Sequence, residues 1–275
     1  MFVPNTNNKY PYPEDTSSHY ISVKKNRGFV FDKDYPYVDC SKGFAFKRFW
    51  VRLLLRLIVF PLTHLNMGIK IKGKKNLKNN KELLKKGAIT ISNHIHYWDY
   101  ICVMKAVHNY KWPYILAWDK NVNGESGPLV RMVGGIPIPL HDNEATIAFS
   151  NSIKKMLDAG GFLHIYPEGS MWEYYAPIRP FKNGAASIAI RNNKPIIPMA
   201  FSYRKPGWFR RVILKQPAAI TLNIGKPLFV YEEINKSKRV EDLTIRAHQA
   251  DCSLAGFKND NIYEPIYNNS KMIKS

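Results

Sequence analysis

Ile89-Thr-Ile-Ser-Asn-His-Ile-His-Tyr-Trp-Asp99 is the stretch around which the chain is organised. The apolar run from Ala88 to Ser92 predicts a buried strand. This strand leads directly into Asn93 and His94, and Asp99 follows five residues after the histidine. A histidine that acts as a general base needs a carboxylate to fix its tautomer. The stretch places both groups at the exit of a buried strand.

Strands and helices alternate along the rest of the chain. Further strands are predicted at 114–118, 162–166, 196–202, 212–215 and 219–224, an extended segment with a tight entry at 134–139, and helices at 100–108, 142–159, 184–192 and 232–257. The alternation of Ile69 and Ile71 with lysines adds an edge strand. This pattern predicts an α/β fold class, with a single domain built on a mainly parallel central sheet flanked by helices.

Changes in composition divide the chain into four regions. Residues 1–43 form an N-terminal extension rich in Tyr, Pro, Asn, Ser and Asp, without periodicity, and are expected to be partly disordered or wrapped over the domain. Residues 44–66 are an amphipathic helix, and residues 67–257 are the main domain. Residues 258–275 are predicted to be a loose C-terminal tail.

The predicted helix at 44–66 combines aliphatic and aromatic residues with four cations and no acid. Its uninterrupted apolar stretches are too short to span a bilayer core of about 30 Å. An interfacial helix fits better, with Trp50 at the acyl boundary. Arg48, Arg52 and Arg56 are four residues apart and form one stripe, which we expect to face lipid headgroups. The alternative is a basic-sided helix packed on the core of the domain.

The formal net charge of +20 indicates an anionic partner. Nucleic acid is one such partner, but the sequence contains no zinc finger, glycine-aromatic ribonucleoprotein block or other known module. Trp208 and Phe209 stand in a turn flanked by cations and predict a second membrane contact, with an exposed basic hairpin as the alternative. We therefore expect a membrane surface as the partner and no nucleic acid.

Two other chemistries in the opening stretch are disfavoured. His94, His96 and Asp99 suggest a metal cluster, but hydrolases of the His-x-His-x-Asp-His type place the aspartate two residues after the second histidine. Here the spacing is three, no histidine follows, and the three cysteines have no metal-binding spacing, so no metal site is expected. Cys102 is expected to be a buried helix cysteine rather than a nucleophile. Alone, the histidine and aspartate are also compatible with a surface histidine and an N-cap.

Two downstream segments supply further polar groups. Tyr166-Pro-Glu-Gly-Ser170 ends a predicted strand, and ligands bind beyond the carboxyl ends of strands in open α/β sheets. Its proline and glycine shape a tight turn that presents Glu168. Arg179 and Lys182 precede a short predicted helix, whose N-terminus is a natural anion site. The alternatives are a β-turn with an exposed glutamate and two solvated cations.

Four blocks, in order and spacing, resemble the PlsC-type family of glycerolipid acyltransferases, which includes lysophosphatidic acid acyltransferases. Asn93-His94-x4-Asp99 resembles the NHxxxxD motif of the family, and Gly134-Gly-Ile-Pro-Ile-Pro139 lies where its second block lies. Tyr166-Pro-Glu-Gly-Ser170 resembles the block F-P-E-G-T, and Pro195-Ile-Ile-Pro198 resembles V-P-x-x-P. The resemblance covers residues 66–230 and identifies the main domain as an acyltransferase domain.

The resemblance implies a membrane-associated O-acyltransferase of phospholipid biosynthesis. The acyl group would move from acyl-CoA or acyl-acyl carrier protein to a hydroxyl of a lysophospholipid, with 1-acylglycerol-3-phosphate as the expected acceptor and phosphatidic acid as the product. His94 would take the hydroxyl proton while Asp99 holds the imidazole, without an acyl-enzyme. No cofactor or metal is implied besides the acyl thioester. The implied location is the cytoplasmic face of the cell membrane, where the protein would be peripheral or monotopic.

The resemblance also implies where the substrate binds, and there the sequence departs from the family. The substrate-binding residues that it implies are Glu168, Gly169 and Ser170, and the candidate cations beside them are Arg179, Lys182 and Arg131. The family's glutamate block continues with an arginine that helps hold the acceptor phosphate, but here Met171 follows, and Pro139-Leu140 stands where the second block usually ends with an arginine. Arg179, Lys182 or Arg131 would substitute, or the acceptor is a lipid without a phosphomonoester. A third alternative is a relative that has become a thioesterase or a lipid-binding protein.

His96 is a further departure, because the residue two after the catalytic histidine is commonly serine in the family. This leaves open which histidine pairs with Asp99, although His94 is favoured.

Overall fold

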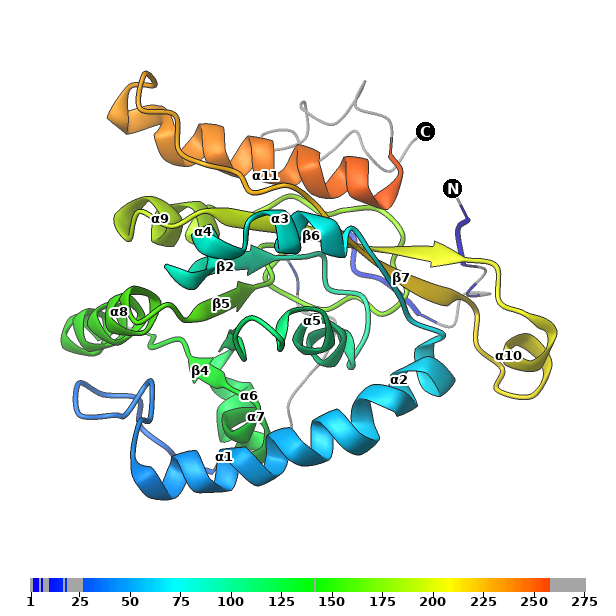
Figure 1. Cartoon of the computed structure of the whole chain (residues 1–275), viewed down its shortest axis with the longest axis horizontal. Helices are drawn as coiled ribbons and strands as arrows, with labels where there is room; N and C mark the ends of the chain where they lie inside the picture. The colour runs from blue at the N-terminus through cyan, green and yellow to red at the C-terminus, as the bar shows by residue number, and fades with distance from the viewer. Residues whose placement is uncertain are drawn as a thin grey trace.

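One sheet of seven strands runs through the part of the chain that this computed structural model describes, which is residues 2–4, 6, 10–16, 18, 27–140 and 142–257. The strand order is β1-β7-β6-β2-β5-β3-β4 (Figure 1). The strands are β1 Lys70–Lys72, β2 Ala88–Ile91, β3 Tyr114–Ala117, β4 Gly135–Pro137, β5 Phe162–Ile165, β6 Ile196–Arg204 and β7 Ala219–Ile224. Every neighbouring pair is parallel except β6 and β7, which are antiparallel. The predicted α/β class with a mainly parallel sheet is confirmed.

β2 lies at the centre of the sheet, between β6 and β5. All four of its residues are buried, as expected for a parallel strand that is covered on both faces. Thr90 of β2 lies opposite His164 of β5. Because the two strands are parallel neighbours, the loops that follow them leave the sheet at the same edge.

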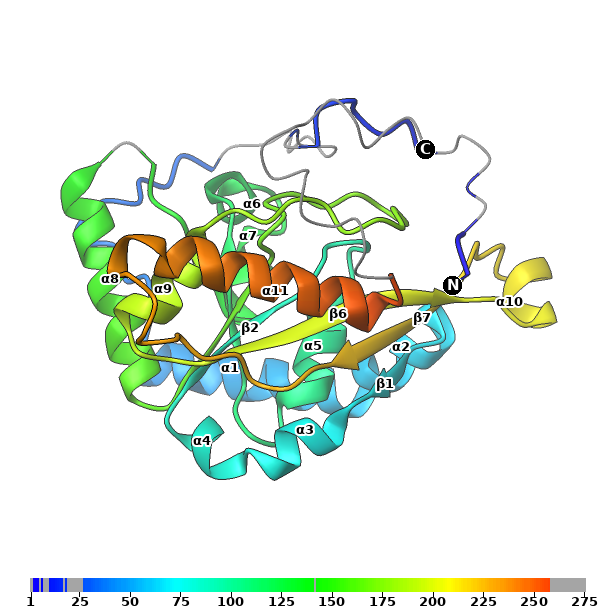
Figure 2. The ribbon, with the colours of Figure 1, turned by 90° about the horizontal axis from the view of Figure 1, so that it is seen from above.

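Helices cover both faces of the sheet (Figures 1 and 2). One long helical segment consists of α1 Lys42–Leu54, a π-helical turn Leu55–Val59 and α2 Phe60–Met67, and it lies on the same side as α5 Asp99–Val107. The other face is covered by α8 Asn143–Asp158, α9 Gly184–Arg191 and α11 Arg239–Ala255. The remaining helices are short: α3 Lys74–Asn79, α4 Lys81–Lys85, α6 Asp119–Asn123, α7 Gly127–Met132, α10 Trp208–Val212 and the 3₁₀ turn Lys236–Lys238.

Two hydrophobic cores result, one on each face. Ile89 and Ile91 of β2 belong to the core under α8, α9 and α11, whereas Phe162 of β5 belongs to the core under α2 and α5. Adjacent residues such as Phe162 and Leu163 are buried on opposite faces, because side chains alternate along a strand. β2 and β5 are therefore packed against a hydrophobic core on both faces of the sheet.

The structure corrects two of the predicted elements. Residues 212–215 were expected to form a strand, but α10 ends at Val212 and Ile213 and Leu214 are exposed in the turn after it. A short apolar run gives no period that distinguishes a strand from a helical turn. The C-terminal helix begins at Arg239 rather than at Glu232. The predicted loose tail, 258–275, lies outside the described residues.

Candidate active site

Asn93 fixes the exit of β2 onto the neighbouring strand. Its side chain is fully buried, donates to the carbonyl of Phe201 at 3.1 Å and accepts from the N–H of Phe201 at 2.7 Å. This two-way amide contact continues the link to β6 beyond the last residue of β2, Ile91. An amide side chain is needed here because it must donate and accept at once.

Asp99 holds both the ring of His94 and the backbone around it. One carboxylate oxygen, Oδ2, lies 3.1 Å from His94 Nδ1 and accepts from the N–H groups of Ile95 at 2.6 Å and His96 at 2.8 Å. The Asp99 side chain is fully buried, whereas that of His94 is 23 % exposed. When Nδ1 carries the proton and donates it to this carboxylate, Nε2 keeps the lone pair that a general base needs.

The geometry distinguishes the two histidines. Asp99 contacts the ring of His94, but it contacts His96 through the backbone N–H. The ring of His96 instead accepts from the N–H of Trp98 at 3.1 Å, and burial lowers the pKa of His96 despite the carboxylate of Asp99 nearby. The imidazole paired with Asp99 is therefore that of His94.

Two aromatic residues at the end of β5 complete the surroundings of His94, and neither was predicted from the sequence as a site residue. The ring of Tyr166 stacks on that of His94, with centroids 3.7 Å apart and planes within 3° of parallel. The edge of His164 meets Tyr166 at 4.6 Å. His164 and Tyr166 are two residues apart, so their side chains point to the same face of the sheet. A histidine inside an otherwise apolar strand is the sequence signal that could have identified His164.

Glu168 connects the loop after β5 to the loop after β2. Its carboxylate accepts from the backbone N–H of His94 at 3.1 Å and from the backbone N–H of Arg179 at 2.8 Å. Backbone hydrogen bonds from Trp172 to His94 and from Tyr174 to Ile95 join the two loops further. Glu168, one of the predicted substrate-binding residues, therefore holds the backbone of the loop that carries His94.

Arg179 is not available as a ligand for an acceptor phosphate in this structure, which corrects that expectation. Its guanidinium pairs with Glu168 at 3.0 Å, and both side chains are 2 % exposed. It also donates to the hydroxyl of Ser170 at 2.7 Å and stacks on Trp172 at 4.5 Å. A buried cation must be paired in this way because burial without a partner is costly.

The N-terminal segment covers the same loop. The carbonyl of Ser18 accepts from the hydroxyl of Ser170 and from the indole N–H of Trp172, and the carbonyl of Thr16 accepts from Arg179. The ring of Tyr12 stacks on Trp172 with centroids 5.6 Å apart. These described residues of the extension are wrapped over the domain, as one of the two sequence expectations stated.

The other two candidate cations lie in different places. Lys182 is exposed beside Gly169, and a Cβ built on that glycine would lie 2.8 Å from the Lys182 ammonium. Gly169 has φ +81°, a conformation that favours glycine. Because glycine has no Cβ, the Lys182 ammonium can lie directly against this turn. Arg131 instead donates to the carbonyls of Pro36, Tyr37 and Gly135. Gly135 begins β4, so these contacts hold Arg131 away from the strand ends that carry His94.

Two of the predicted membrane-contact arginines face the protein. Arg48 is 5 % exposed and donates to the hydroxyl of Tyr114 at 2.8 Å, and Arg52 lies over the ring of Trp112 at 5.3 Å. The expectation that these residues form a stripe toward lipid headgroups is therefore wrong for Arg48 and Arg52. Arg56 is exposed.

The outward side of the same helical segment is apolar instead. Side chains at least 41 % exposed gather on α1, α2 and the neighbouring α10: Phe46, Phe49, Trp50, Leu54, Leu57, Ile58, Leu62, Leu65, Trp208 and Phe209. We call these ten residues the apolar face. Large exposed apolar patches mark interaction sites. Among the helices that the structure describes, none is long and apolar enough to cross a membrane.

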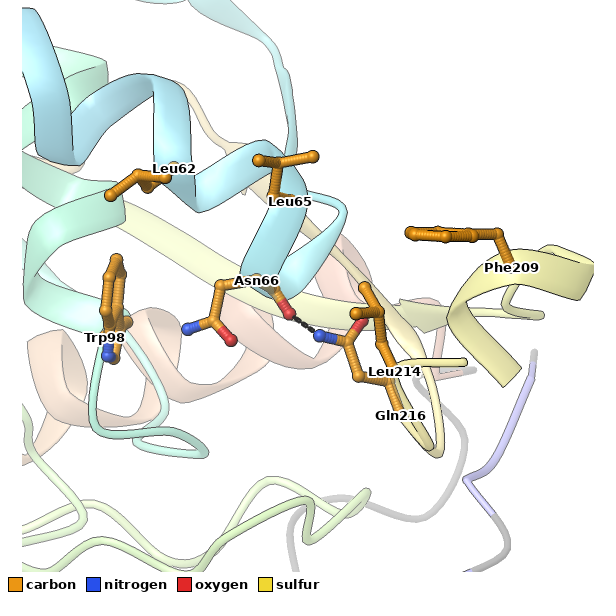
Figure 3. Close-up of a pocket in the computed structure, with 7 residues that line it drawn as sticks. All are labelled: Leu62, Leu65, Asn66, Trp98, Phe209, Leu214 and Gln216. Atoms are coloured by element: carbon orange, nitrogen blue, oxygen red, sulfur yellow. Dashed lines mark hydrogen bonds between the residues drawn. The ribbon is translucent and has the colours of Figure 1, made fainter. Parts of the chain in front are cut away.

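An apolar groove of about 430 Å³ lies between α2 and α10 (Figure 3). Figure 3 shows aliphatic and aromatic side chains on its walls, namely Leu62, Leu65, Trp98, Phe209 and Leu214. The side-chain amide of Gln216 donates to the carbonyl of Asn66 across it. Trp98 immediately precedes Asp99, so the groove joins the apolar face to the loop that holds His94.

The described residues contain no group of three His, Cys, Asp or Glu side chains positioned to hold a metal ion. Burial raises the pKa of the Cys102 thiol well above its ordinary value, so this cysteine stays protonated and does not act as a nucleophile at neutral pH.

Two comparisons with known proteins found similar proteins. Residues 68–202 match the model of a family described as Acyltransferase. The matched segment includes His94, Asp99 and Glu168. Among solved structures, the chain is similar to that described as the 1-acyl-sn-glycerophosphate (LPA) acyltransferase, PlsC, from Thermotoga maritima, with 14 % identity, a TM-score of 0.48, and 77 % of this chain and 83 % of that chain covered. No curated protein matches the sequence.

Proposed function

The chain belongs to the Acyltransferase family, and from this premise we propose that it moves a fatty acyl group from acyl-CoA or acyl-acyl carrier protein to a hydroxyl of a lysophospholipid. The preferred acceptor is 1-acylglycerol-3-phosphate, and the product is phosphatidic acid. The observation that carries the proposal is the contact between Asp99 and the His94 ring, at 3.1 Å on the exit of β2.

His94 and Asp99 supply the proton transfers of the reaction. His94 Nε2 takes the proton of the acceptor hydroxyl, and the oxygen attacks the thioester carbonyl. The tetrahedral intermediate collapses, the carbon–sulfur bond breaks, and the thiolate receives the proton from His94. Asp99 holds the ring in place and stabilises the imidazolium between the two proton transfers. A positioned base of this kind accelerates such a step by about 10²–10⁴.

Lys182 is the acceptor cation in this proposal. Of the three candidates, Arg179 is enclosed in its ion pair with Glu168, and Arg131 is bound to backbone carbonyls. The Lys182 ammonium is exposed over Gly169, in the turn between β5 and α9. An ammonium group binds phosphate as a point charge.

The protein works at the cytoplasmic face of a membrane, as a peripheral or monotopic enzyme. The apolar face supplies the hydrophobic contact, and the net charge of +20 attracts an anionic lipid surface. The groove beside Trp98 receives the hydrocarbon chain of the lipid acceptor, because its walls are apolar and it leads from the apolar face to the catalytic loop.

Acyl transfer from radiolabelled acyl-CoA and acyl-acyl carrier protein to a panel of lysolipids tests the proposal. Wild type is expected to acylate 1-acylglycerol-3-phosphate, and His94→Ala is expected to lose activity by at least about 10². Full activity of His94→Ala would overturn the mechanism. A product formed only with acceptors that lack a phosphomonoester would overturn the acceptor, and thioester loss without acylated lipid would indicate hydrolysis.

A further inference from the structure

Three aromatic rings stand in a row at the carboxyl edge of the sheet. The rings of His94 and Tyr166 are parallel, with centroids 3.7 Å apart, and His164 meets Tyr166 edge-on at 4.6 Å with planes at 88°. The row joins the catalytic loop after β2 to the end of β5. Asp99 holds the edge of the His94 ring, whereas Tyr166 covers its face.

We propose that Tyr166 is a positioning residue for acyl transfer, whose ring holds the His94 imidazole in plane and stabilises the imidazolium that forms when His94 takes the hydroxyl proton. The inference rests on the proposed role of His94 as the base. The electron-rich face of a phenol attracts a cation stacked on it. The ring face stabilises imidazolium more than neutral imidazole. The contact therefore favours the state in which His94 has taken the proton of the acceptor hydroxyl.

The ring face of Tyr166 is the part that acts. Its hydroxyl is buried and has no hydrogen-bond partner among the described residues. Burial raises the pKa of this hydroxyl well above its ordinary value, so it carries no charge near neutral pH. A phenylalanine ring would present a similar face in the same place.

His164 keeps Tyr166 in place without adding a charge. Its ring Nδ1 lies 2.9 Å from the hydroxyl of Thr90, and Nε2 lies 3.4 Å from that of Ser92. Burial, with a smaller contribution from His94, lowers the pKa of His164 to about 3. His164 is therefore neutral at physiological pH and adds no positive charge beside the phenol.

The titratable groups around His94 come from four segments of the chain. Asp99 belongs to α5, His164 to β5 with Tyr166 directly after it, Glu168 to the following loop, and His96 to the loop of His94 itself. The charge of Glu168 is matched by Arg179. Replacing Tyr166 by an uncharged residue therefore leaves all charges around His94 unchanged.

Steady-state acyl transfer as a function of pH tests the inference with Tyr166→Leu and Tyr166→Phe. The leucine variant is expected to lose about 3- to 30-fold in kcat, with KM for both substrates nearly unchanged. The acidic limb of its pH–rate profile moves to lower pH by about 0.5–1 pH unit, because the imidazolium is less stable without the aromatic face. Tyr166→Phe is expected to stay within about 3-fold of wild type, since it keeps a ring face.

Tyr37→Leu is a matched control, because Tyr37 is also a buried tyrosine, 1 % exposed, that packs on Phe149 outside the site. It is expected to lose thermal stability and keep kcat and the pH profile. If Tyr166→Leu does not fold by circular dichroism, Tyr166→Met fills the space without an aromatic face and takes its place. A folded leucine or methionine variant with wild-type kcat and pH profile overturns the inference. In the same assay, an active His94→Ala would overturn the proposed base itself, which separates the two failures.

Discussion

The carboxylate of Glu168 accepts a hydrogen bond from the backbone N–H of His94 at 3.1 Å, although 74 residues separate them in the chain. The same carboxylate pairs with Arg179, and the pair is covered by Trp172 and the N-terminal segment. A buried ion pair therefore holds the backbone of the loop that carries His94. This arrangement explains why a glutamate is needed at a position that the sequence suggested for substrate binding.

Replacing Arg179 with methionine leaves the carboxylate of Glu168 buried without its partner. The free energy of unfolding is expected to fall by about 3–5 kcal/mol, as measured by urea denaturation. The double variant Glu168→Gln with Arg179→Met is expected to lose less than the sum of the two single variants, because both charges are removed together. Arg246→Met is the control: Arg246 pairs with Asp242 in a partly exposed bridge, so the loss should stay near 1 kcal/mol or less. Equal losses for both arginines would contradict the role of the buried pair.

Asp99→Asn is expected to lower kcat by about 10²–10⁴. The amide keeps the size of the side chain but lacks the negative charge that stabilises the imidazolium. Asp158→Asn serves as the control, because Asp158 forms surface bridges with Lys154 and Lys194. Initial rates of acyl transfer measure both variants, and circular dichroism checks their folding. An Asp99→Asn enzyme within tenfold of wild type would show that Asp99 only holds the backbone of Ile95 and His96.

His164 makes the folded state sensitive to acid. Burial lowers its pKa to about 3 from an ordinary value of about 6.5, so between these values the unfolded chain binds a proton that the folded chain does not. Stability is therefore complete above about pH 6.5 and falls by up to about 1.4 kcal/mol for each pH unit below it. His164→Asn is expected to show a flatter dependence between pH 6 and pH 4 in urea unfolding. An identical slope in wild type and variant would refute the assignment.

Arg48 and Arg56 are expected to behave differently, although they lie on the same predicted stripe. Arg56→Gln should weaken binding to vesicles containing phosphatidylglycerol by about fivefold, because an exposed cation near an anionic surface contributes about 1 kcal/mol. Arg48→Gln should lower stability instead, since it removes the buried contact with Tyr114. Vesicle sedimentation and thermal unfolding measure the two effects. Trp50→Glu is the positive control, as it places a charge on the apolar face.

Lys182→Met is expected to raise KM for 1-acylglycerol-3-phosphate about 5- to 20-fold with kcat little changed, because a hydrogen-bonded charge contact to the phosphate is lost. Lys182→Arg keeps the charge and should recover most of the affinity. KM for monoacylglycerol, which has no phosphate, should be the same in all three enzymes. An unchanged KM for the phosphorylated acceptor in Lys182→Met would exclude this lysine from the acceptor site.

Much of the site followed from local sequence patterns. An apolar run too short for a helix predicted β2. The motif after it predicted that His94 and Asp99 share one turn, and in the structure His94 Nδ1 lies 3.1 Å from Asp99 Oδ2. The order of the blocks identified the acyltransferase family, which the match over residues 68–202 confirms. These features depend on residues close together in the chain, so their consequences are visible without tertiary information.

The side toward which each cation points did not follow from the sequence. Arg48, Arg52 and Arg56 have a helical spacing that predicts one stripe, but the spacing alone does not tell which side of the helix meets the domain. The aromatic rings of Tyr114 and Trp112, distant in sequence, attract Arg48 and Arg52 to the inner side. Many apolar side chains of the segment, such as Trp50 and Leu57, are left outside, although Leu55 and Phe60 pack into the core.

The α/β class, the family, and the position of His94 and Asp99 at the end of a buried strand were therefore predictable from local sequence patterns. Their surroundings were not: Tyr166 lies on the face of the imidazole, Glu168 holds the backbone N–H of His94, and Arg179 is enclosed instead of free. A motif reports hydrogen bonds within one turn, whereas stacking, burial and ion pairing depend on which distant segments the sheet brings together.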